Sequence, residues 1–591
     1  MRRQIFIVIA FVLLLRLPFL DQAIQGDDFY YLAAAQHAQI DPAHPHHAKY
    51  VFLGEPMDMR GHPHPPGNAW ILAGLLALLG EIREVPFHVA YLLLSLIAAL
   101  SMLALARRFV PPRALEATLL FCAVPAFVVN GNSLEADLPF LAFWLLSIAL
   151  VVAGRAGLAA IAIVLCSLMA YQSVLLIPIL GLWLWHEGEL KRRWWLLLIP
   201  AAVLGGYNLF ERITSGDMPA QVLNQHFQTY GLQRLEMKLK SAVALSGHLI
   251  VMLTPIGFYA LLRRRHWFLS AWVGLFFAAA LVLFFAGSAR YLLPLAAPFA
   301  ILVALHYAQR PMMIFACLAL QLALGLSLAW VNFEHWDGYR RFTDGALKDV
   351  QVEYGRQRVW VNSEWGLRYY TEARGALPIV RGQVLRPGDL VITNELAEKI
   401  PFTTGGGQLV EQSRLVIQPA LPLRLIGLGV KSGYSSVGFG LWPFDITTAP
   451  VDIVTISQIV EKKPTLSWLP MATPSTESQI ISGVYTLENG AWRWMSGRAV
   501  FFLKPPSGPK PLRAEIVIPD MAPGRTVTLT LDGVEVLKRT FDKPDTYTLE
   551  TPPLPTKGDT AVVTLSIDKD FSVPGDNRKL GLILTAIGFQ P

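Results

Sequence analysis

Two short acidic motifs contain the residues of this chain that are best suited to chemistry. Asp27 and Asp28 are adjacent in "QGDDFYYL", a few residues after an apolar segment that ends at residue 20, and Glu135 and Asp137 stand in "NSLEADLPF". A carboxylate within hydrogen-bond reach of a hydroxyl group can take its proton as a general base. Acids also favour helix N-termini, so an ordinary helix cap is the alternative interpretation of the first pair.

A histidine-rich stretch and a late arginine supply groups of the opposite kind. Six of the 13 histidines lie within residues 37–64, and the last two are His62 and His64 in "HPHPPGNAW". Their spacing would let two imidazoles share a divalent metal ion, although solvated loop histidines are the alternative interpretation. Arg290 in "GSARYLLP" could hold a phosphate group, or it could extend to a membrane surface.

The composition indicates that membrane-spanning helices position these motifs. Of 591 residues, 53% are hydrophobic and only 16% are charged. Apolar runs approaching the roughly 20 residues that cross a bilayer recur in residues 1–331, and we expect about eleven spans there. Basic clusters follow every second span, as at residues 107–108 and 191–193. The net charge of +7 is therefore read as a topology signal and not as a nucleic-acid-binding surface.

This topology predicts that both acidic motifs lie at one outer membrane face. The first span, residues 5–20, runs outward from a cytoplasmic N-terminus into a predicted extracytoplasmic loop, residues 21–68. Arg16 is expected to extend from the outer end of this span toward water. The second acidic motif also follows a span that runs outward. We therefore predict that Asp27 and Asp137 meet in one outward-facing cleft.

Beyond residue 331 the sequence changes to that of an exported soluble region. Residues 332–475 mix short strands with helices and predict an α/β region, whose glycine-rich segment "GYSSVGFGLWPFD" reads as a surface loop. Residues 476–591 contain recurrent strand patterns that predict a jelly-roll-like β-sandwich, with a hairpin turn at Asp532-Gly533. The predicted fold class is thus a multi-pass α-helical membrane protein with an exported α/β region and a β-sandwich.

Two further observations concern sugar binding by the exported region and whether that region contains disulfides. Trp492 and Trp494 could stack on a sugar, but tryptophans of this kind more often fill a core. The three cysteines, Cys122, Cys166 and Cys317, all fall in apolar spans. The exported region is therefore expected to fold without disulfides.

Taken together and in order, the motifs resemble those of GT-C-type membrane glycosyltransferases that use polyprenyl-phosphate sugars. This group, similar to glycosyltransferase family 39, includes protein O-mannosyltransferases and aminoarabinose transferases. "GDDFYYLAAAQ" resembles the Asp-Glu-x-x-Tyr segment of the family, "HPHPPGNAW" its basic-Pro-Pro motif, and "LEADLPFLAFWLLS" its second acidic motif. "SARYLLPLAAPFAIL" is similar to its late Arg-Tyr-x-x-Pro segment, and "HWDGYRRF" with "VWVNSEWGLRYY" to its junction with the exported domain. Asp28 stands where the family usually has Glu, and His64 where aminoarabinose transferases have Lys.

The resemblance implies an enzyme that transfers a sugar from a polyprenyl-phosphate donor to a glycan, lipid or protein acceptor, with inversion at the anomeric carbon. Asp27 is the implied general base, and Asp28 would orient the acceptor or hold a cation. Arg290 would contact the leaving phosphate, assisted by protonated His64. The remaining implied donor- and acceptor-binding residues are Tyr31, His62, Glu135, Asp137 and Tyr291. No cofactor is certain, and a divalent metal ion at His62 and His64 remains open. The implied location is the bacterial inner membrane, with the C-terminal domain in the periplasm.

Other functions remain open at this point. The spans could form a transporter with an exported substrate-binding domain, but such proteins place acids near the membrane midplane and often repeat their halves. A membrane-anchored binding protein would not need so many spans. An oligosaccharide ligase is the nearest enzymatic competitor, because it also uses a lipid-linked sugar at this face.

Overall fold

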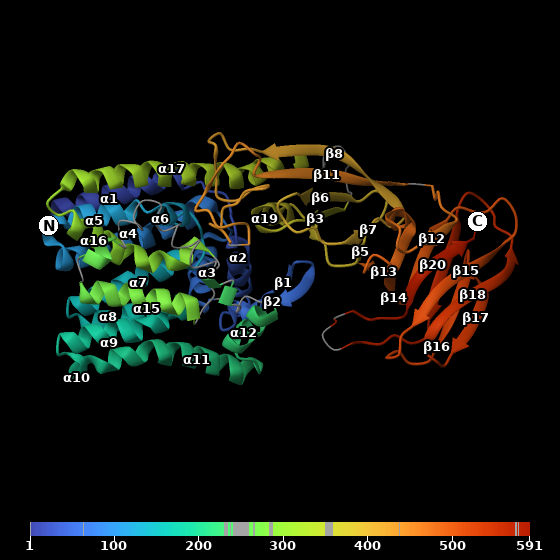
Figure 1. Cartoon of the computed structure of the whole chain (residues 1–591), viewed down its shortest axis with the longest axis horizontal. Coiled ribbons are helices and arrows are strands. Elements are labelled where there is room, and N and C mark those ends of the chain that lie inside the picture. The colour runs from blue at the N-terminus through green and yellow to red at the C-terminus, as the bar shows by residue number, and fades with distance from the viewer. Residues whose placement is uncertain are drawn as a thin grey trace.

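The computed structural model describes residues 2–590 except 63, 230–234, 237, 240–258, 264–265, 283–287, 349–357, 437, 462, 574–575 and 577. A bundle of helices, a mixed α/β part and a β-sheet part follow one another along the long axis of the molecule (Figure 1). The N-terminus lies at the far end of the bundle and the C-terminus lies in the β-sheet part (Figure 1).

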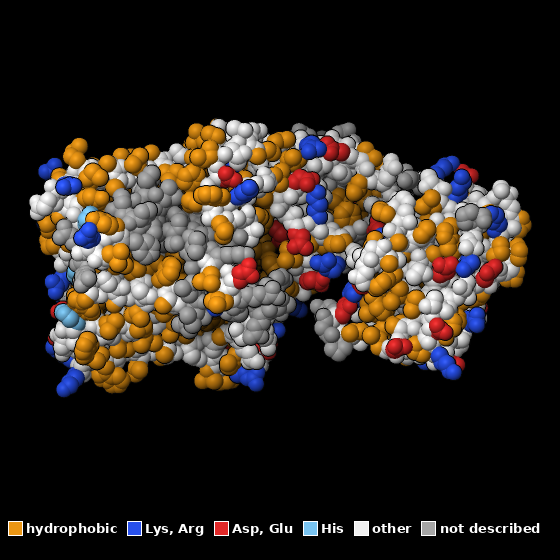
Figure 2. Space-filling model, in the orientation of Figure 1, with side chains coloured by type: hydrophobic (Ala, Val, Ile, Leu, Met, Phe, Trp, Pro, Cys, Tyr) orange, Lys and Arg blue, Asp and Glu red, His pale blue; other side chains and the backbone are white. Residues whose placement is uncertain are grey.

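The bundle consists of helices that run roughly along the long axis (Figure 1). Its helices are α1 (Arg2–Arg16), α4 (Glu84–Phe109), α5 (Ala114–Cys122), α6 (Pro125–Asn130), α7 (Asp137–Val152), α8 (Ala156–Met169), α9 (Leu176–His186), α10 (Leu190–Arg193), α11 (Leu198–Ser215), α15 (Trp267–Val282), α16 (Ala296–His306) and α17 (Pro311–Phe342). On the face shown in Figure 2, charged side chains gather at the N-terminal end of the bundle and are sparse over its middle. This distribution is expected of a bundle that crosses a bilayer.

The predicted number of about eleven spans is not confirmed. Among the described residues, three helical segments are long and apolar enough to cross a membrane: Glu84–Phe109, Leu190–Ser215 and Pro311–Leu347. Six other apolar helices have 10–17 residues. The predicted span over residues 115–129 is divided into α5 and α6, because Pro125 begins a new helix at a position that needs no N–H donor. The predicted span Ala242–Leu262 lies mostly outside the described residues.

The prediction that Arg16 extends toward water is wrong. Its guanidinium is buried, and it donates to the carbonyl oxygens of Phe127 at 2.8 Å and Val128 at 2.7 Å and to Ser95 Oγ at 3.1 Å. The two carbonyl oxygens belong to α6, whereas Ser95 belongs to α4. A Cβ atom at Gly131 would lie 1.7 Å from Arg16 Nη2, so glycine is required there. Arg16 therefore holds the short helix α6 in the bundle.

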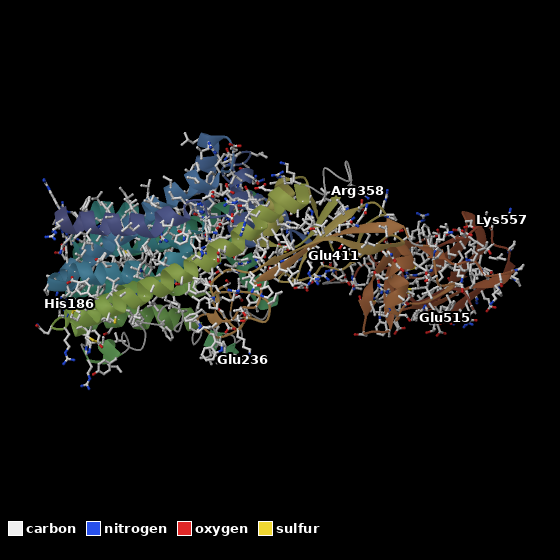
Figure 3. All side chains as sticks on the ribbon, turned by 90° about the horizontal axis from the view of Figure 1, so that it is seen from above. His186, Glu236, Arg358, Glu411, Glu515 and Lys557 are labelled. Atoms are coloured by element: carbon white, nitrogen blue, oxygen red, sulfur yellow. The ribbon has the colours of Figure 1, made fainter. Side chains whose placement is uncertain are left out.

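The loop predicted over residues 21–68 is folded. It contains α2 (Asp28–His37), the strand pair β1 (Lys49–Phe52) and β2 (Glu55–Asp58), and two short 3-10 turns, and it leads into α3 (Gly67–Leu79). These elements lie at the end of the bundle that faces the α/β part (Figure 1). His186 lies at the opposite end (Figure 3), close in sequence to the basic cluster at residues 191–193. The predicted loop and this basic cluster thus occupy opposite ends of the bundle.

The α/β part is built on a five-stranded sheet of order β4-β3-β6-β11-β8. Its strands are β3 (Val359–Asn362), β4 (Leu377–Pro378), β6 (Leu390–Asn394), β8 (Gly407–Ile417) and β11 (Asp452–Glu461). Helix α17 continues without a break past residue 331 and packs with α19 (Trp365–Ala373) on this part. The change from apolar to polar residues near 332 therefore falls inside one helix.

The C-terminal part is β-rich, as predicted, but its nine strands form one hydrogen-bonded sheet. The sheet has the order β17-β16-β19-β14-β20-β15-β18, with β12 paired to β20 and β13 to β14. Its strands are β12 (Trp468–Pro470), β13 (Ile480–Glu488), β14 (Trp492–Leu503), β15 (Lys510–Ile518), β16 (Arg525–Leu531), β17 (Val534–Phe541), β18 (Asp545–Leu554), β19 (Ala561–Ile567) and β20 (Ile583–Phe589). The sheet curls around one apolar core. The hairpin prediction is confirmed, since Asp532 and Gly533 join β16 to β17 with positive φ angles of 48° and 83°.

Candidate active site

Arg290 brings together three carboxylates from two distant segments. It lies in the 3-10 turn Ala289–Leu295, directly before α16. Its Nε atom lies 2.8 Å from Glu135 Oε2 and 3.0 Å from Asp137 Oδ2, and its Nη2 atom donates to Asp27 Oδ2 at 3.2 Å. The predicted meeting of Asp27 and Asp137 is therefore confirmed, because both contact the same guanidinium group. We call these four residues the acid–arginine cluster.

Within the cluster, the carboxylates differ in how far solvent can reach them. The side chain of Asp27 is 44% exposed, whereas those of Glu135 and Asp137 are 5% and 7% exposed. Burial raises the pKa of Glu135 well above its usual range, and the nearby Arg290 opposes this shift only in part. Asp27 is thus the carboxylate of the cluster that solvent can reach.

Asp28 points away from Arg290 and holds the two acidic motifs together. Its Oδ1 atom accepts hydrogen bonds from Ser133 Oγ at 2.9 Å and from the Leu134 N–H at 2.8 Å, and its Oδ2 accepts one from the Gln25 N–H at 3.2 Å. Burial raises the pKa of Asp28 to about 7, although these donors oppose the shift. Protein donors occupy both oxygens, so this geometry favours a positioning role over contact with an acceptor or a cation.

The backbone at Gly26 and Asp27 also lies close to the Glu135 side chain and makes a second connection between the two acidic motifs. The Asp27 N–H donates to Glu135 Oε1 at 3.2 Å. Gly26 has a positive φ of 47°, and a Cβ atom there would lie 3.0 Å from the same oxygen. The glycine allows the chain to turn past Glu135 and to present the Asp27 side chain beyond it.

The remaining predicted residues form a layer of rings beside the cluster. The Arg290 guanidinium lies 5.3 Å from the centre of the Tyr291 ring, and the His64 ring centre lies 6.5 Å from that of Tyr291. The buried Tyr31 ring contacts His62 edge-on at 4.8 Å and lies 6.0 Å from His64. All nine candidate residues are therefore in or next to one site.

The expected contribution of protonated His64 is not supported. Burial and the neighbouring positive charge of Arg290 lower the pKa of His64 to about 4, so its imidazole is neutral near pH 7. His64 Nδ1 lies 3.2 Å from the Met169 carbonyl oxygen. A carbonyl only accepts hydrogen bonds, so Nδ1 carries the hydrogen and Nε2 is an acceptor. Such an imidazole offers a leaving phosphate neither a positive charge nor a donor at Nε2.

The glycine-rich segment of the α/β part enters the site, which the sequence did not predict. Tyr434 is only 5% exposed, and its hydroxyl donates to Asn130 Oδ1 at 2.6 Å. Ser288 Oγ, two residues before Arg290, donates to the Tyr434 carbonyl at 3.0 Å. The prediction of a surface loop is therefore wrong at Tyr434. Its aromatic ring packs among the apolar residues of the bundle, which stabilises burial.

A cavity of about 50 Å³ lies between this segment and the acid–arginine cluster. Its lining includes Gln25, Glu135, Arg290, Asn332, Trp336 and Tyr434. Trp336 Nε1 donates to Asn332 Oδ1 at 2.9 Å, and Asn332 Nδ2 donates to Gln25 Oε1 at 2.6 Å. Asn332 and Trp336 in this hydrogen-bonded wall belong to the part of α17 beyond residue 331, for which the sequence offered only a polar run.

Helix α2 is anchored to the α/β part through buried charges. Tyr30 OH donates to Glu364 Oε2 at 2.7 Å, and Arg368 pairs with Glu364 at 3.2 Å and with Glu372 at 2.6 Å. The Leu53 N–H donates to the other oxygen of Glu364 at 3.2 Å. The α/β part therefore helps to fix the helix that begins at Asp28.

The metal site expected at His62 and His64 stays a prediction. The centres of the two rings are 5.8 Å apart. The two histidines do not belong to a group of three or more potential ligands in the described part of the chain. A different set of histidines does form such a group and is treated below.

Comparisons with known proteins agree with the motifs. Residues 63–205 match the family model described as dolichyl-phosphate-mannose-protein mannosyltransferase. No curated protein matches the chain.

Three solved structures show weak similarity. ArnT from Cupriavidus metallidurans bound to undecaprenyl phosphate is 11% identical, with a TM-score of 0.44 over 76% of this chain and 97% of the other. ArnT from the same organism in the apo state is 12% identical, with a TM-score of 0.40 over 66% and 92%. A mutant of the arabinofuranosyltransferase AftD from mycobacteria is 13% identical, with a TM-score of 0.39 over 100% and 62%.

The matched segment 63–205 carries the "HPHPPGNAW" motif from its second residue onward and the whole second acidic motif. Their order along the chain and their meeting near Arg290 agree with the resemblance described above. The family match thus confirms the predicted resemblance of this chain to GT-C-type membrane glycosyltransferases that use polyprenyl-phosphate sugars.

Proposed function

We propose that this protein transfers a sugar from a polyprenyl-phosphate donor to an acceptor hydroxyl at the outer face of a bacterial inner membrane. The observation that carries the proposal is the convergence of Asp27, Glu135 and Asp137 on Arg290. The description of the matched family names dolichyl-phosphate-mannose, and this supports a lipid-linked sugar as the donor. The sugar and the acceptor, whether glycan, lipid or protein, are not specified by these residues.

The site can promote direct displacement at the anomeric carbon. The acceptor oxygen attacks that carbon while Asp27 takes the hydroxyl proton, and the bond to the phosphate oxygen breaks with both electrons leaving on the phosphate. One displacement of this kind inverts the anomeric centre. The positive charge that develops on the sugar would be stabilised by the nearby carboxylates, as in glycoside hydrolysis.

Arg290 is suited to bind the leaving phosphate because its positive charge, now shared among three carboxylates, would become available if one of them were protonated. In this structure it balances three carboxylates, and burial already favours the protonated form of Glu135. A bound phosphate would further favour protonation of Glu135 and would then share the guanidinium with Asp137. The remaining positive charge of Arg290 would stabilise the departing group.

The location of the cluster favours an enzyme over a transporter. Helix α2, which begins at Asp28, lies at the end of the bundle that faces the α/β part (Figure 1). A transporter that couples ions to substrate movement would need its acids near the middle of the spans. A donor whose lipid tail stays in the bilayer instead requires a site at the membrane surface, open to both lipid and water.

The proposal is tested by mixing the purified protein with radiolabelled polyprenyl-phosphate sugars and cell-envelope fractions. Appearance of label in a glycan, lipid or protein, with release of the lipid phosphate, is expected. Uptake of label into vesicles without transfer would instead support the transporter. Reporter fusions after Ala106, Val129 and Val331 test the orientation, and a cytoplasmic signal from the last fusion would contradict an outward-facing site.

A further inference from the structure

A group of potential metal ligands lies in the first loop, outside the acid–arginine cluster. In the segment "DPAHPHH", Asp41, His44 and His47 each place one potential ligand atom within 4.8 Å of the others. His44 Nδ1 lies 2.9 Å from Asp41 Oδ2, and the two imidazoles stack with their ring centres 4.6 Å apart. The 3-10 turn Pro45–His47 produces this arrangement, because residues three apart align in such a turn.

A buried acid from a distant helix contacts this group through His47. Glu211, near the end of α11, places Oε2 2.9 Å from His47 Nε2, and its side chain is only 2% exposed. Thr214 Oγ1, one turn further along α11, lies 2.9 Å from His44 Nε2. The first loop therefore meets α11 through two histidines at once.

One oxygen of Glu211 lacks a partner, and this is an independent sign of a missing ligand. Oε2 accepts from Ser215 Oγ at 3.2 Å and contacts His47, but Oε1 is buried and has no hydrogen-bond partner in the described part of the chain. A buried carboxylate oxygen without a donor is costly. The positive charge of a cation bound at Asp41, His44 and His47 would lower this cost.

We propose that Asp41, His44 and His47 bind one divalent transition-metal ion, for which zinc is the best fit, and that the buried Glu211 orients His47 through its contact with Nε2. Two imidazole nitrogens and one carboxylate oxygen suit zinc, with a water molecule in the fourth position, whereas calcium and magnesium prefer oxygen ligands alone. The carboxylates of Asp41 and Glu211 together balance the charge of a divalent ion. Thr214 and Ser215 lie where they can orient His44 and Glu211 through hydrogen bonds.

The ion would fasten the first loop to α11 next to the candidate active site. His46 lies between the two histidine ligands, and its ring centre is 5.1 Å from that of His62. His62 in turn contacts Tyr31 beside the acid–arginine cluster. Arg60 also pairs with Asp217, just beyond α11, so a second contact supports the same junction. The proposed role is structural and does not depend on the transfer reaction.

The experiment measures bound metal directly. The full chain is purified in detergent with an affinity tag free of histidine, stripped with a chelator, incubated with zinc and separated from free metal by gel filtration. Elemental analysis should then give about one zinc ion per chain. The double variant His44→Ala/His47→Ala should retain less than about a tenth of that amount, and Glu211→Gln should weaken binding about tenfold or more in competition with a chelator. Cobalt in place of zinc should give the visible absorption of a tetrahedral site.

The matched control is His37→Ala, which removes a histidine of the same loop that lies outside the ligand group. It should bind zinc as the unaltered chain does, and its gel-filtration profile sets the standard for a folded sample. His44→Gln/His47→Gln, which keeps side-chain volume, replaces the alanine pair if that pair does not fold. The proposal is overturned if the unaltered chain retains no zinc, if either double variant that folds binds as much as the unaltered chain, or if Glu211→Gln has unchanged affinity.

Discussion

Replacing Asp27 by asparagine removes from the acid–arginine cluster the carboxylate that solvent can reach. Asparagine keeps the size of the side chain but cannot accept a proton at neutral pH. Arg290 would keep its contacts with Glu135 at 2.8 Å and Asp137 at 3.0 Å. The substitution therefore separates loss of a base from loss of the site.

The structure predicts a large effect on rate and a small effect on stability. The Asp27 side chain is 44% exposed and its pair with Arg290 spans 3.2 Å, so solvent screens the interaction and its loss should cost ~0–1 kcal/mol. Loss of a positioned general base typically lowers a rate by ~10²–10⁴-fold. At 1.36 kcal/mol for each factor of ten, that decrease raises the barrier by ~3–5 kcal/mol.

The assay compares initial rates of transfer from a radiolabelled polyprenyl-phosphate sugar, with thermal unfolding followed by tryptophan fluorescence in the same detergent. Asp21→Asn is the matched control. Asp21 belongs to the same loop, is 63% exposed and pairs with Arg340 at 2.9 Å, away from Arg290. This control should change the free energy of unfolding by no more than about 1 kcal/mol and should leave the rate near that of the unaltered chain.

Two results would refute the reasoning. If Asp27→Asn transfers sugar at a rate within about threefold of the unaltered chain, Asp27 is not the base. If Asp21→Asn lowers the rate as much as Asp27→Asn, the effect belongs to the loop as a whole and not to the carboxylate at Arg290.

Three further predictions concern residues around the site. Gly131→Ala should destabilise the protein by at least ~1–3 kcal/mol, because the added Cβ would overlap the buried guanidinium of Arg16, and thermal unfolding measures this loss. Tyr434→Phe should cost ~1–3 kcal/mol in the free energy of unfolding, because Asn130 Oδ1 loses a buried donor at 2.6 Å. Asp28, whose pKa is raised from 3.8 to about 7, contributes stability that is present below about pH 4 and lost as the pH rises to about 7. Asp28→Asn should therefore remove that decrease from a series of unfolding midpoints between pH 4 and 7.

Each of these predictions has a comparison that can contradict it. Gly157→Ala in α8 adds a Cβ that meets no atom within 4 Å, and it should be neutral or slightly stabilising. A Tyr434→Phe variant within about 0.5 kcal/mol of the unaltered chain would indicate a side chain exposed at the surface. An unchanged pH dependence in Asp28→Asn would mean that other groups titrate over this range.

The sequence alone predicted the features that depend on neighbouring residues. The Asp532-Gly533 turn could be predicted because a two-residue hairpin requires positive φ angles at both positions, which favour this pair. The division of apolar and polar segments followed from composition, because roughly 20 apolar residues are needed to cross a bilayer. The order of short motifs also indicated which residues would meet at Arg290.

The different roles of Asp27 and Asp28 became visible only in the tertiary structure. The two carboxylates are adjacent and chemically alike, yet Asp28 is fully buried against Ser133 and Leu134 while Asp27 reaches solvent. The sequence also placed Tyr434 on the surface, because a glycine-rich segment has no periodicity that reveals burial.

The sequence by itself thus determined which local elements form and which chemical groups the chain offers. The tertiary structure decided which groups meet, as Glu211 meets His47 and Asp27 meets Arg290. It also decided which carboxylates lose contact with water. Burial therefore favours the protonated form of Glu135, while Asp27 stays in contact with solvent. Local periodicity reflects contacts between near neighbours, whereas desolvation and ion pairing depend on residues that are distant along the chain and become adjacent only through folding.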